Sequence, residues 1–146
     1  MKHSSVLIVG CGDIGIRTGG LLMAQGWGVA GVRRDSSKLP AEFFAYAANY
    51  TQSASLDFIA PLEPDFVLAT FNPADRTPAG YKAGFQTAMS HLISGLGSHR
   101  PRHILMVSST RVFAEARGGW VHDDSPLTDD DPCALAIIAA EQQLLA

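Results

Sequence analysis

Cysteine is scarce in this sequence, and its charge is modest. Cys11 and Cys133 are the only two cysteines in 146 residues, which excludes a disulfide framework and the ligand spacing of a metal site. The formal net charge of −3 argues against a broad surface for nucleic acid or anionic membranes. No apolar run approaches the length that a membrane span requires.

We also expect no secretory signal, because the first residues show neither a long apolar stretch nor a small-residue cleavage site. We therefore expect a cytoplasmic protein with reduced cysteines. Hydrophobic residues make up 47% of the chain and charged residues 17%, which predicts a compact core rather than disorder. The length predicts one domain over residues 1–146, without internal repeats.

The most informative segment that is present is a glycine-rich turn. The apolar run Val6–Val9 breaks into Gly10-Cys11-Gly12-Asp13-Ile14-Gly15 and then opens a helical pattern. Gly10 permits a tight turn, Gly12 lets the backbone approach a pyrophosphate, and Gly15 lets the helix pack against the sheet. Free N–H groups at the helix start favour an anion. We expect these glycines, with Asp13 and Ile14, to hold a dinucleotide; the alternative is a turn without a ligand.

Strand-like and helical segments alternate along the chain. The predicted strands are the apolar runs Val6–Val9, Gly28–Val32, Phe43–Ala47, Phe66–Thr70 and His103–Val107. The predicted helices cover residues 14–25, Ser53–Ala60, Tyr81–Ile93 and Ala134–Ala146. Gly26 is expected to end the first of them, and Gly95 and Gly97 are expected to end the third. This alternation predicts an α/β fold of the Rossmann type, a doubly wound parallel sheet of about five strands with helices on both faces.

The end of the second predicted strand selects between the two nicotinamide cofactors. An acidic residue there would hold the ribose hydroxyls of NAD, whereas an arginine accommodates the 2′-phosphate of NADP. Arg33 and Arg34 occupy this point, and Asp35 comes late enough to be a turn or helix-cap residue. We expect NADP to be preferred over NAD, unless both arginines only solvate the strand end. Backbone at Thr70 or Phe71 is expected to line the cofactor, unless it forms an ordinary proline-stopped loop.

A second specific signal is the segment Ile104–Phe113, which contains Ser108-Ser109-Thr110 and Val112-Phe113. With the glycine turn, it resembles the extended short-chain dehydrogenase/reductase superfamily, which includes nucleotide-sugar epimerases and dehydratases. The fifth strand of that family ends in a Ser-Ser-x-x-Val-Tyr-Gly type of motif. Gly118–Pro126 resembles the family loop G-x-W-x-x-E-x-x-P, and Glu141 resembles the end of the family's active-site helix. The resemblance covers nearly the whole chain and is closest to atypical members with G-x-G-x-x-G.

This resemblance assigns Ser109 a catalytic role, because the matching serine of the family hydrogen-bonds the reacting oxygen of the substrate. The alternative is a strand end whose hydroxyls satisfy their own backbone. The family also needs Tyr-x-x-x-Lys, but those positions fall at or near Cys133 and Ile137, and neither Tyr nor Lys follows Lys82. We expect Cys133 to be structural and Asp129–Asp131 to be a solvated loop that caps the last helix.

The chain is also shorter than a complete family member, and the resemblance implies that a C-terminal substrate lobe is absent. We therefore expect an NADP-binding domain of an oxidoreductase or epimerase/dehydratase, with an unknown small-molecule substrate. The alternatives are a non-catalytic NADP-binding or redox-sensing module and an inactive fragment. The apolar last helix, together with dimerisation of the family through the corresponding helices, leads us to expect a homodimer.

Overall fold

The computed structural model describes residues 3–146 and contains one sheet of five parallel strands. The strands are β1 (Ser5–Val9), β2 (Gly28–Arg33), β3 (Phe44–Ala47), β4 (Phe66–Ala69) and β5 (His103–Met106). They lie in the order β3-β2-β1-β4-β5, and every neighbouring pair is parallel. This sheet confirms the predicted Rossmann-type fold, and each strand lies within about a residue of its predicted bounds.

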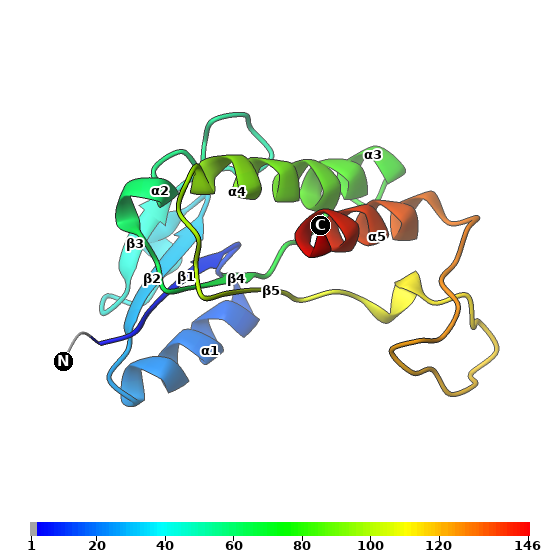
Figure 1. Cartoon of the computed structure of the whole chain (residues 1–146), viewed down its shortest axis with the longest axis horizontal. Coiled ribbons are helices and arrows are strands. Elements are labelled where there is room, and N and C mark those ends of the chain that lie inside the picture. Colours follow the sequence, from blue (N-terminus) through cyan, green and yellow to red (C-terminus); the bar gives the residue numbers. More distant parts are fainter. Residues whose placement is uncertain (1–2) are drawn as a thin grey trace.

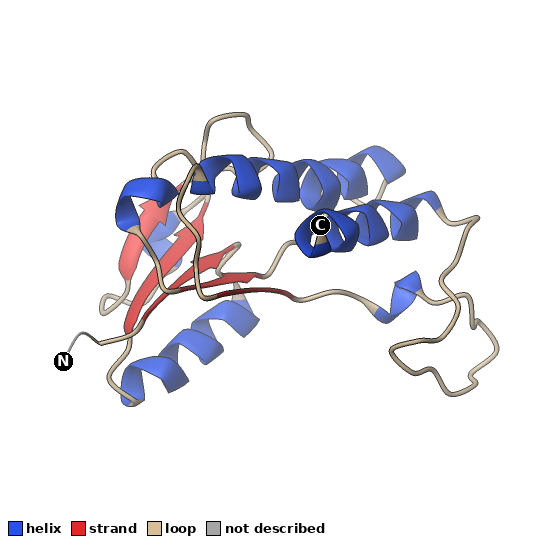
Figure 2. Ribbon diagram, in the orientation of Figure 1, coloured by secondary structure: helices blue, strands red, loops and turns tan. Residues whose placement is uncertain are grey.

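Helices cover both faces of the sheet (Figures 1 and 2). The helices are α1 (Asp13–Ala24), α2 (Ile59–Leu62), α3 (Pro78–Tyr81), α4 (Ala88–Leu96) and α5 (Pro132–Leu145). A π-helical segment, Lys82–Thr87, joins α3 to α4, and short 3₁₀ turns at Ser36–Lys38 and Thr110–Val112 follow β2 and β5. In Figure 1, α1 lies on one face and α4 and α5 lie on the other. Among the described residues, none of the helices has the length and apolar character needed to cross a bilayer.

Side chains of β1 alternate between two core layers. Leu7 and Val9 pack into the layer that contains α4 and α5 residues such as Ile137, whereas Val6 and Ile8 pack into the layer on the α1 side. These four side chains are all buried. A central parallel strand is covered on both faces, which is why it is an unbroken apolar run instead of an alternating one.

The end of α1 is the glycine stop that the sequence predicts. Gly26 has φ +84° and donates its N–H to the carbonyl of Met23, while the N–H of Trp27 donates to the carbonyl of Leu22. These two bonds form a Schellman motif, which satisfies carbonyls at the helix terminus and requires a left-handed residue that glycine adopts readily.

The face of α1 that meets the sheet contains two buried glycines, Gly15 and Gly19, beside larger side chains such as that of Leu22. A Cβ atom at Gly15 would lie 2.8 Å from the Cγ2 of Ile8, and one at Gly19 would lie 2.5 Å from a ring carbon of Phe43. Ile14 and Leu21, whose spacing predicts this helix, are instead 54% and 70% exposed. The spacing therefore identifies the helix correctly but marks the face that packs only in part, through Leu22.

The predicted helix Ser53–Ala60 is wrong in its extent. Turns occupy most of that segment, with Ala54 at φ +61°, and only the single-turn helix α2 follows, at Ile59–Leu62. Pro61 determines where α2 begins, because proline is tolerated only where its missing N–H has no helical partner. A helix that includes Pro61 must therefore begin just before it.

The predicted helix Tyr81–Ile93 is confirmed, but it begins earlier and ends later. Thr77 caps α3 through a hydrogen bond from the N–H of Gly80, and the helical rod runs on to Leu96. Gly95 does not stop it, since it lies inside α4, where a Cβ would be 2.4 Å from the carbonyl oxygen of Leu56. The π-helical segment shifts the phase of the apolar stripe, so Ile93 is 41% exposed and Leu96 is buried.

Candidate functional site

The candidate site lies at the carboxyl edge of the sheet, where three strands end in register. Val9 of β1 pairs with Val32 of β2 and with Ala69 of β4, so the residues that follow these strands meet. The chain order reverses here, because β2 and β3 lie on one side of β1 and β4 and β5 lie on the other. Ligands of open α/β sheets bind in the crevice at such a switch point.

Gly10 makes the turn that leaves β1. Its φ is +79°, and a Cβ atom there would lie 2.6 Å from the backbone oxygen of Thr70. The N–H groups of Gly10 and Cys11 both donate to the carbonyl of Val32 at 2.9 Å, and the Thr70 hydroxyl donates to the Gly10 carbonyl at 2.7 Å. Only glycine satisfies both the backbone angle and the space, so the tight turn expected from the sequence is present.

Gly12 differs from Gly10, because the space around it is open. The nearest atom to an ideal Cβ at Gly12 is 3.9 Å away, and no side chain caps the N-terminus of α1. Asp13 opens the helix and pairs with Arg17 across an exposed 3.1 Å contact. The first N–H groups of α1 therefore begin at a point where the backbone is bare of side chains, an arrangement that suits an anion.

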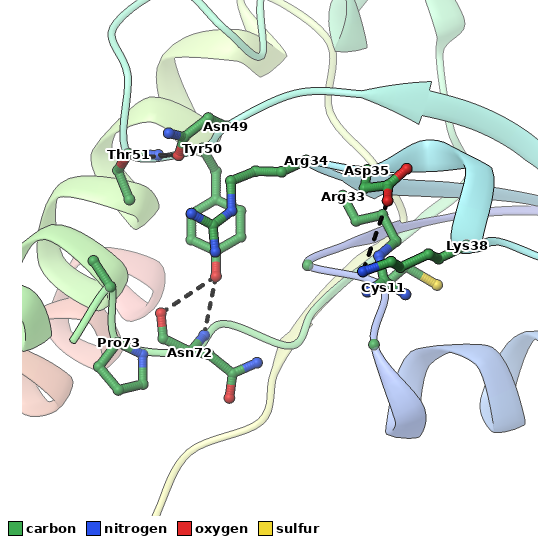
Figure 3. A pocket seen from close by; sticks show the side chains of 13 residues that line it. Cys11, Arg33, Arg34, Asp35, Lys38, Asn49, Tyr50, Thr51, Asn72 and Pro73 are labelled. Atoms are coloured by element: carbon green, nitrogen blue, oxygen red, sulfur yellow. Dashed lines mark hydrogen bonds and ion pairs between the residues drawn. The ribbon is translucent and has the colours of Figure 1, made fainter. Parts of the chain in front are cut away.

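Two cavities adjoin at this turn, since both are lined by Gly10, Gly12, Asn72 and Pro73. The first cavity, of about 270 Å³, lies beside the ends of β2 and β3 and is shown in Figure 3. Its polar lining comprises Arg33, Arg34, Asp35, Lys38, Asn49, Tyr50, Thr51 and Asn72. Three cationic side chains therefore border one small cavity. The sequence predicts two of them, Arg33 and Arg34.

Asp35 has the capping role that its position predicts. Its Oδ1 accepts hydrogen bonds from the hydroxyl of Ser37 at 2.6 Å and from the N–H of Ser37 at 3.2 Å, and Lys38 lies 3.7 Å from Oδ2. The hydroxyl bond, more than any other contact, lowers the pKa of Asp35 below its ordinary value. The carboxylate is thereby engaged in ordering the turn Ser36–Lys38, which brings Lys38 to the cavity.

Tyr50 ties the far wall of the first cavity to the loop after β4. Its hydroxyl donates to the carbonyl of Asn72 and accepts from the N–H of Asn72 at 3.1 Å, as the dashed lines in Figure 3 show. The ring also packs against Phe71, with the two centroids 5.0 Å apart. The loop at the switch point is therefore fixed from both sides, by Thr70 at the glycine turn and by Tyr50.

The second cavity, of about 510 Å³, lies on the β4 and β5 side of the turn. Besides the shared residues, it is lined by Asp13, Ile14, Thr70, Phe71, Tyr81, Phe85, Val107, Ser108, Ser109 and Ile137. Ser109 Oγ accepts a 3.2 Å hydrogen bond from the N–H of Arg111 and caps the 3₁₀ turn, which leaves its own O–H able to donate. The Ser108 hydroxyl instead donates to the Glu141 carboxylate of α5.

Tyr81, which lines this second cavity, belongs to a cluster with Arg111 and Asp131. Arg111 Nη1 donates to the Tyr81 hydroxyl at 3.2 Å, and the guanidinium carbon lies 5.0 Å from the ring centroid. Arg111 also forms a forked pair with Asp131, Nε to Oδ2 at 2.6 Å and Nη2 to Oδ1 at 3.2 Å. These bonds raise the pKa of Arg111 and lower the pKa of Asp131. Asp131 also caps α5 through the N–H of Cys133, as the acidic loop predicts.

Cys11 lies inside the glycine turn but not in a reactive state. The side chain is fully buried, and burial raises the pKa of its thiol to about 11, against an opposing effect of Arg33. The neutral thiol therefore dominates near pH 7, and the thiolate, which is the nucleophile, is rare. Cys11 acts as a packing residue at the base of the turn.

The structure brings most of the predicted site residues together. Gly10, Gly12, Arg33 and Arg34 line the first cavity, and Asp13, Ile14, Thr70 and Ser109 line the second. Gly15 lines neither, because it faces Ile8 of the sheet. The two positions matched to the family's tyrosine and lysine differ in their surroundings. Ile137, at the lysine position, lines the second cavity, whereas Cys133, at the tyrosine position, is buried in the core.

Sequence reasoning did not assign a site role to Lys38, Asn49, Tyr50 and Tyr81, which line the cavities, or to Arg111, which contacts Tyr81. Asn49 and Tyr50 follow the third predicted strand directly, and polar residues after a parallel strand are a signal that points to this edge. Tyr81 and Arg111 carry no local signal, because 30 positions separate them and only the fold brings them together.

These features define a Rossmann-type fold with a glycine turn at the switch point of its sheet. No protein-family model matches the chain, and no curated protein matches it either. Solved structures do match it, among them an NAD-dependent epimerase/dehydratase candidate from Methylobacillus flagellatus. That protein shares 29% sequence identity with this chain, with a TM-score of 0.82 over 99% of this chain and 51% of the other.

Two more distant structures share the fold. A short-chain dehydrogenase/reductase superfamily protein from Agrobacterium tumefaciens with bound NAD has 20% identity and a TM-score of 0.75, over 95% of this chain and 43% of the other. The UDP-glucuronic acid 4-epimerase of Bacillus cereus, in complex with UDP-glucuronic acid and NAD, has 16% identity and a TM-score of 0.77, over 95% and 50%.

The expected resemblance to epimerase/dehydratase proteins is therefore confirmed by the structure from Methylobacillus flagellatus, and the two more distant structures confirm the fold. The chain spans about half the length of each of these structures.

Proposed function

We propose that this chain is the NADP-binding domain of an oxidoreductase or epimerase/dehydratase of the extended short-chain dehydrogenase/reductase type. The observation that carries the proposal is the meeting of two cavities at the Gly10 and Gly12 turn, at the switch point of the sheet. Residues 1–146 act as one cofactor-binding domain in this proposal. Its expected location is the cytoplasm, in keeping with two buried, unpaired cysteines.

The residues at the turn fit a dinucleotide. The open space at Gly12 admits a pyrophosphate where a Cβ would project, and Gly10, Asp13, Ile14 and Gly15 set the turn and the start of α1 around it. The adenosine half is assigned to the first cavity and the nicotinamide half to the second, with Thr70 bracing the turn between them. A bound nicotinamide would give or take a hydride at a substrate carbon.

Preference for NADP rests on the charges at the first cavity. Arg33, Arg34 and Lys38 all line it, and a guanidinium fork matches a phosphate through two parallel hydrogen bonds. Asp35, the one carboxylate there, is held by Ser37 in ordering its own turn.

Titration of the chain with NADPH and NADH, followed by calorimetry, tests this preference. The expected result is tighter binding of NADPH, with most of the difference lost in Arg34→Ala. Tighter binding of NADH would contradict the preference while leaving the dinucleotide site intact.

The substrate is proposed to be a small molecule whose reacting oxygen accepts a hydrogen bond from Ser109. The hydroxyl lines the second cavity and still has its hydrogen to donate, which supports this role. A sugar nucleotide is the class to test first, because the Bacillus cereus structure holds UDP-glucuronic acid together with NAD.

A second candidate function is a non-catalytic NADP-binding or redox-sensing module. It is favoured by Ile137, an aliphatic side chain that lines the second cavity at the position matched to the family's lysine. Mixing the chain with NADP⁺ and UDP-sugars and following nicotinamide absorbance separates the two functions. Reduction of the cofactor supports the enzyme, whereas tight binding without any reduction supports the module.

A homodimer is also part of the proposal. Ile93 of α4 and Leu135 and Leu145 of α5 are apolar side chains that remain 41%, 42% and 86% exposed. Their burial between two copies would remove apolar surface from water.

A further inference from the structure

We propose that Tyr81 is the proton donor and acceptor of this site, with Arg111 as its cationic partner. The proposal rests on the proposed function, because it needs a nicotinamide dinucleotide in the adjoining site. It answers a specific problem, which is that the helix carrying Tyr-x-x-x-Lys in the family offers only Cys133 and Ile137 here.

The first observation is the position of Tyr81. Its side chain lines the second cavity together with Ser109. The phenol comes from the segment that follows β4, and the serine hydroxyl comes from the segment that follows β5. Tyr81 is the last residue of α3, whose start is fixed by the Thr77 cap. Gly80 is equally constrained, since a Cβ there would lie 2.2 Å from the Asp75 carboxylate. The π-helical segment begins directly after Tyr81, and such segments occur frequently at functional sites.

The second observation is the contact with Arg111. The guanidinium donates to the Tyr81 oxygen at 3.2 Å, which occupies one lone pair and leaves the phenolic hydrogen to another acceptor. The forked pair with Asp131 holds the guanidinium in place. Arg111 also lies two residues after Ser109 and donates its backbone N–H to the Ser109 oxygen. One 3₁₀ turn therefore positions both the cation and the serine.

The third observation is the chemistry of the remaining cavity lining. The titratable side chains that line the second cavity are Asp13 and Tyr81. Asp13 pairs with Arg17 on the outside of α1, with both side chains more than 70% exposed. Ser108 is committed to Glu141. Both titratable groups therefore have a cationic partner, but the partner of Tyr81 comes from the 3₁₀ turn that also carries Ser109.

The proton transfer follows from this geometry. A bound reduced nicotinamide would supply a hydride to the carbon of a substrate carbonyl, and the carbonyl oxygen would take the proton of the Tyr81 hydroxyl. The phenolic O–H bond breaks, a new O–H bond forms on the substrate, and the Arg111 guanidinium offsets the negative charge left on the phenol oxygen. Water then returns a proton to Tyr81. Oxidation of a secondary alcohol uses the same atoms in reverse.

The test compares Tyr81→Phe with Tyr46→Phe, a matched control that removes the same hydroxyl from β3, where Tyr46 stacks on Phe58. Three readouts are needed. NADPH affinity reports cofactor binding, nicotinamide absorbance reports hydride transfer with UDP-glucuronic acid, UDP-glucose and UDP-galactose, and ¹³C-tyrosine NMR of the cofactor-free chain reports the Tyr81 ring itself.

The expected result is unchanged NADPH affinity in Tyr81→Phe, with hydride transfer slowed by about 100-fold or more. Arg111→Met should move the Tyr81 NMR signal and not that of Tyr46, and it should slow transfer, with partial rescue in Arg111→Lys. Three results would each overturn the inference. They are hydride transfer at the full rate in Tyr81→Phe, a Tyr81 NMR signal that is unchanged in Arg111→Met, and a wild type that binds the cofactor without hydride transfer. Only failure of the wild type to bind any dinucleotide would overturn the proposed function as well.

Discussion

At the residue scale, two glycines of the turn are needed for different physical reasons within one short segment. Gly10 is required by the backbone itself, because its φ is +79° and a Cβ there would lie 2.6 Å from the backbone oxygen of Thr70. Gly12, in contrast, has open space around it. Folding therefore depends on the first glycine, and ligand approach depends on the second.

Substitution of these two residues separates folding from binding. Gly10→Ala should lower the free energy of unfolding by about 1–3 kcal/mol, because it forces a left-handed backbone and a contact with Thr70. Gly12→Ala should leave that free energy nearly unchanged. Urea denaturation followed by circular dichroism measures both, and equal losses in the two variants would contradict the distinction.

Residue patterns predicted one half of the site better than the other. Gly10, Gly12, Arg33, Arg34 and Ser109 follow strands whose apolar runs are unambiguous, so their meeting at one edge follows from parallel topology. Contacts between residues on distant elements leave no local pattern. For this reason the Arg111 bonds to Tyr81 and Asp131 could not be predicted from the sequence.

At the element scale, two substitutions in α1 test whether a glycine is needed for the helix to pack against the sheet. Gly19→Ala should destabilise the chain by about 1–3 kcal/mol, because a Cβ would lie 2.5 Å from the Phe43 ring. Gly20→Ala is the matched control, since no atom lies within 4 Å of its Cβ position, and it should stabilise the helix by ~1 kcal/mol. Thermal melts measure both changes, and destabilisation by both substitutions would argue against this packing.

The Arg111 and Asp131 pair gives the start of α5 a dependence on pH. Arg111 holds the pKa of Asp131 below its ordinary value of 3.8, so the pair contributes stability above that pH and loses it as the pH falls further. Asp131→Asn keeps a capping side chain but removes the charge. It should therefore destabilise the chain at pH 7, and the difference from wild type should shrink below pH ~4.

Urea midpoints at pH 7 and pH 3 measure this effect, with Asp129→Asn as a control in the same loop. A difference between wild type and Asp131→Asn that is equal at both pH values would rule out the ion pair as its cause.

The elements that the sequence predicted well carry a clear local pattern of apolar residues or of helix-start signals. The strands are continuous apolar runs, and α5 has both a capping aspartate and a proline at its start. The elements predicted poorly depend on exceptions to regular spacing. Pro61 restricts α2 to a single turn, and the π-helical segment Lys82–Thr87 shifts the apolar stripe of the rod that contains it.

At the scale of the whole molecule, apolar side chains remain exposed on the outer helices, which supports the proposed homodimer. Sedimentation equilibrium should show an average mass that rises with concentration from 15.5 kDa toward twice that value. Leu135→Asp should shift the chain toward monomer, whereas Leu21→Asp, on the exposed side of α1, should not. A monomer mass independent of concentration would contradict the dimer.

The central claim is that a nicotinamide dinucleotide binds across the Gly10 and Gly12 turn, between the two cavities. The most direct test is the NADPH dissociation constant of Gly12→Ala, measured by calorimetry beside wild type and Gly20→Ala. The account predicts binding by wild type and Gly20→Ala, and a loss of about 10-fold or more in Gly12→Ala, equivalent to ~1.4 kcal/mol. Unchanged NADPH affinity in a folded Gly12→Ala chain, or no binding by wild type, would contradict it.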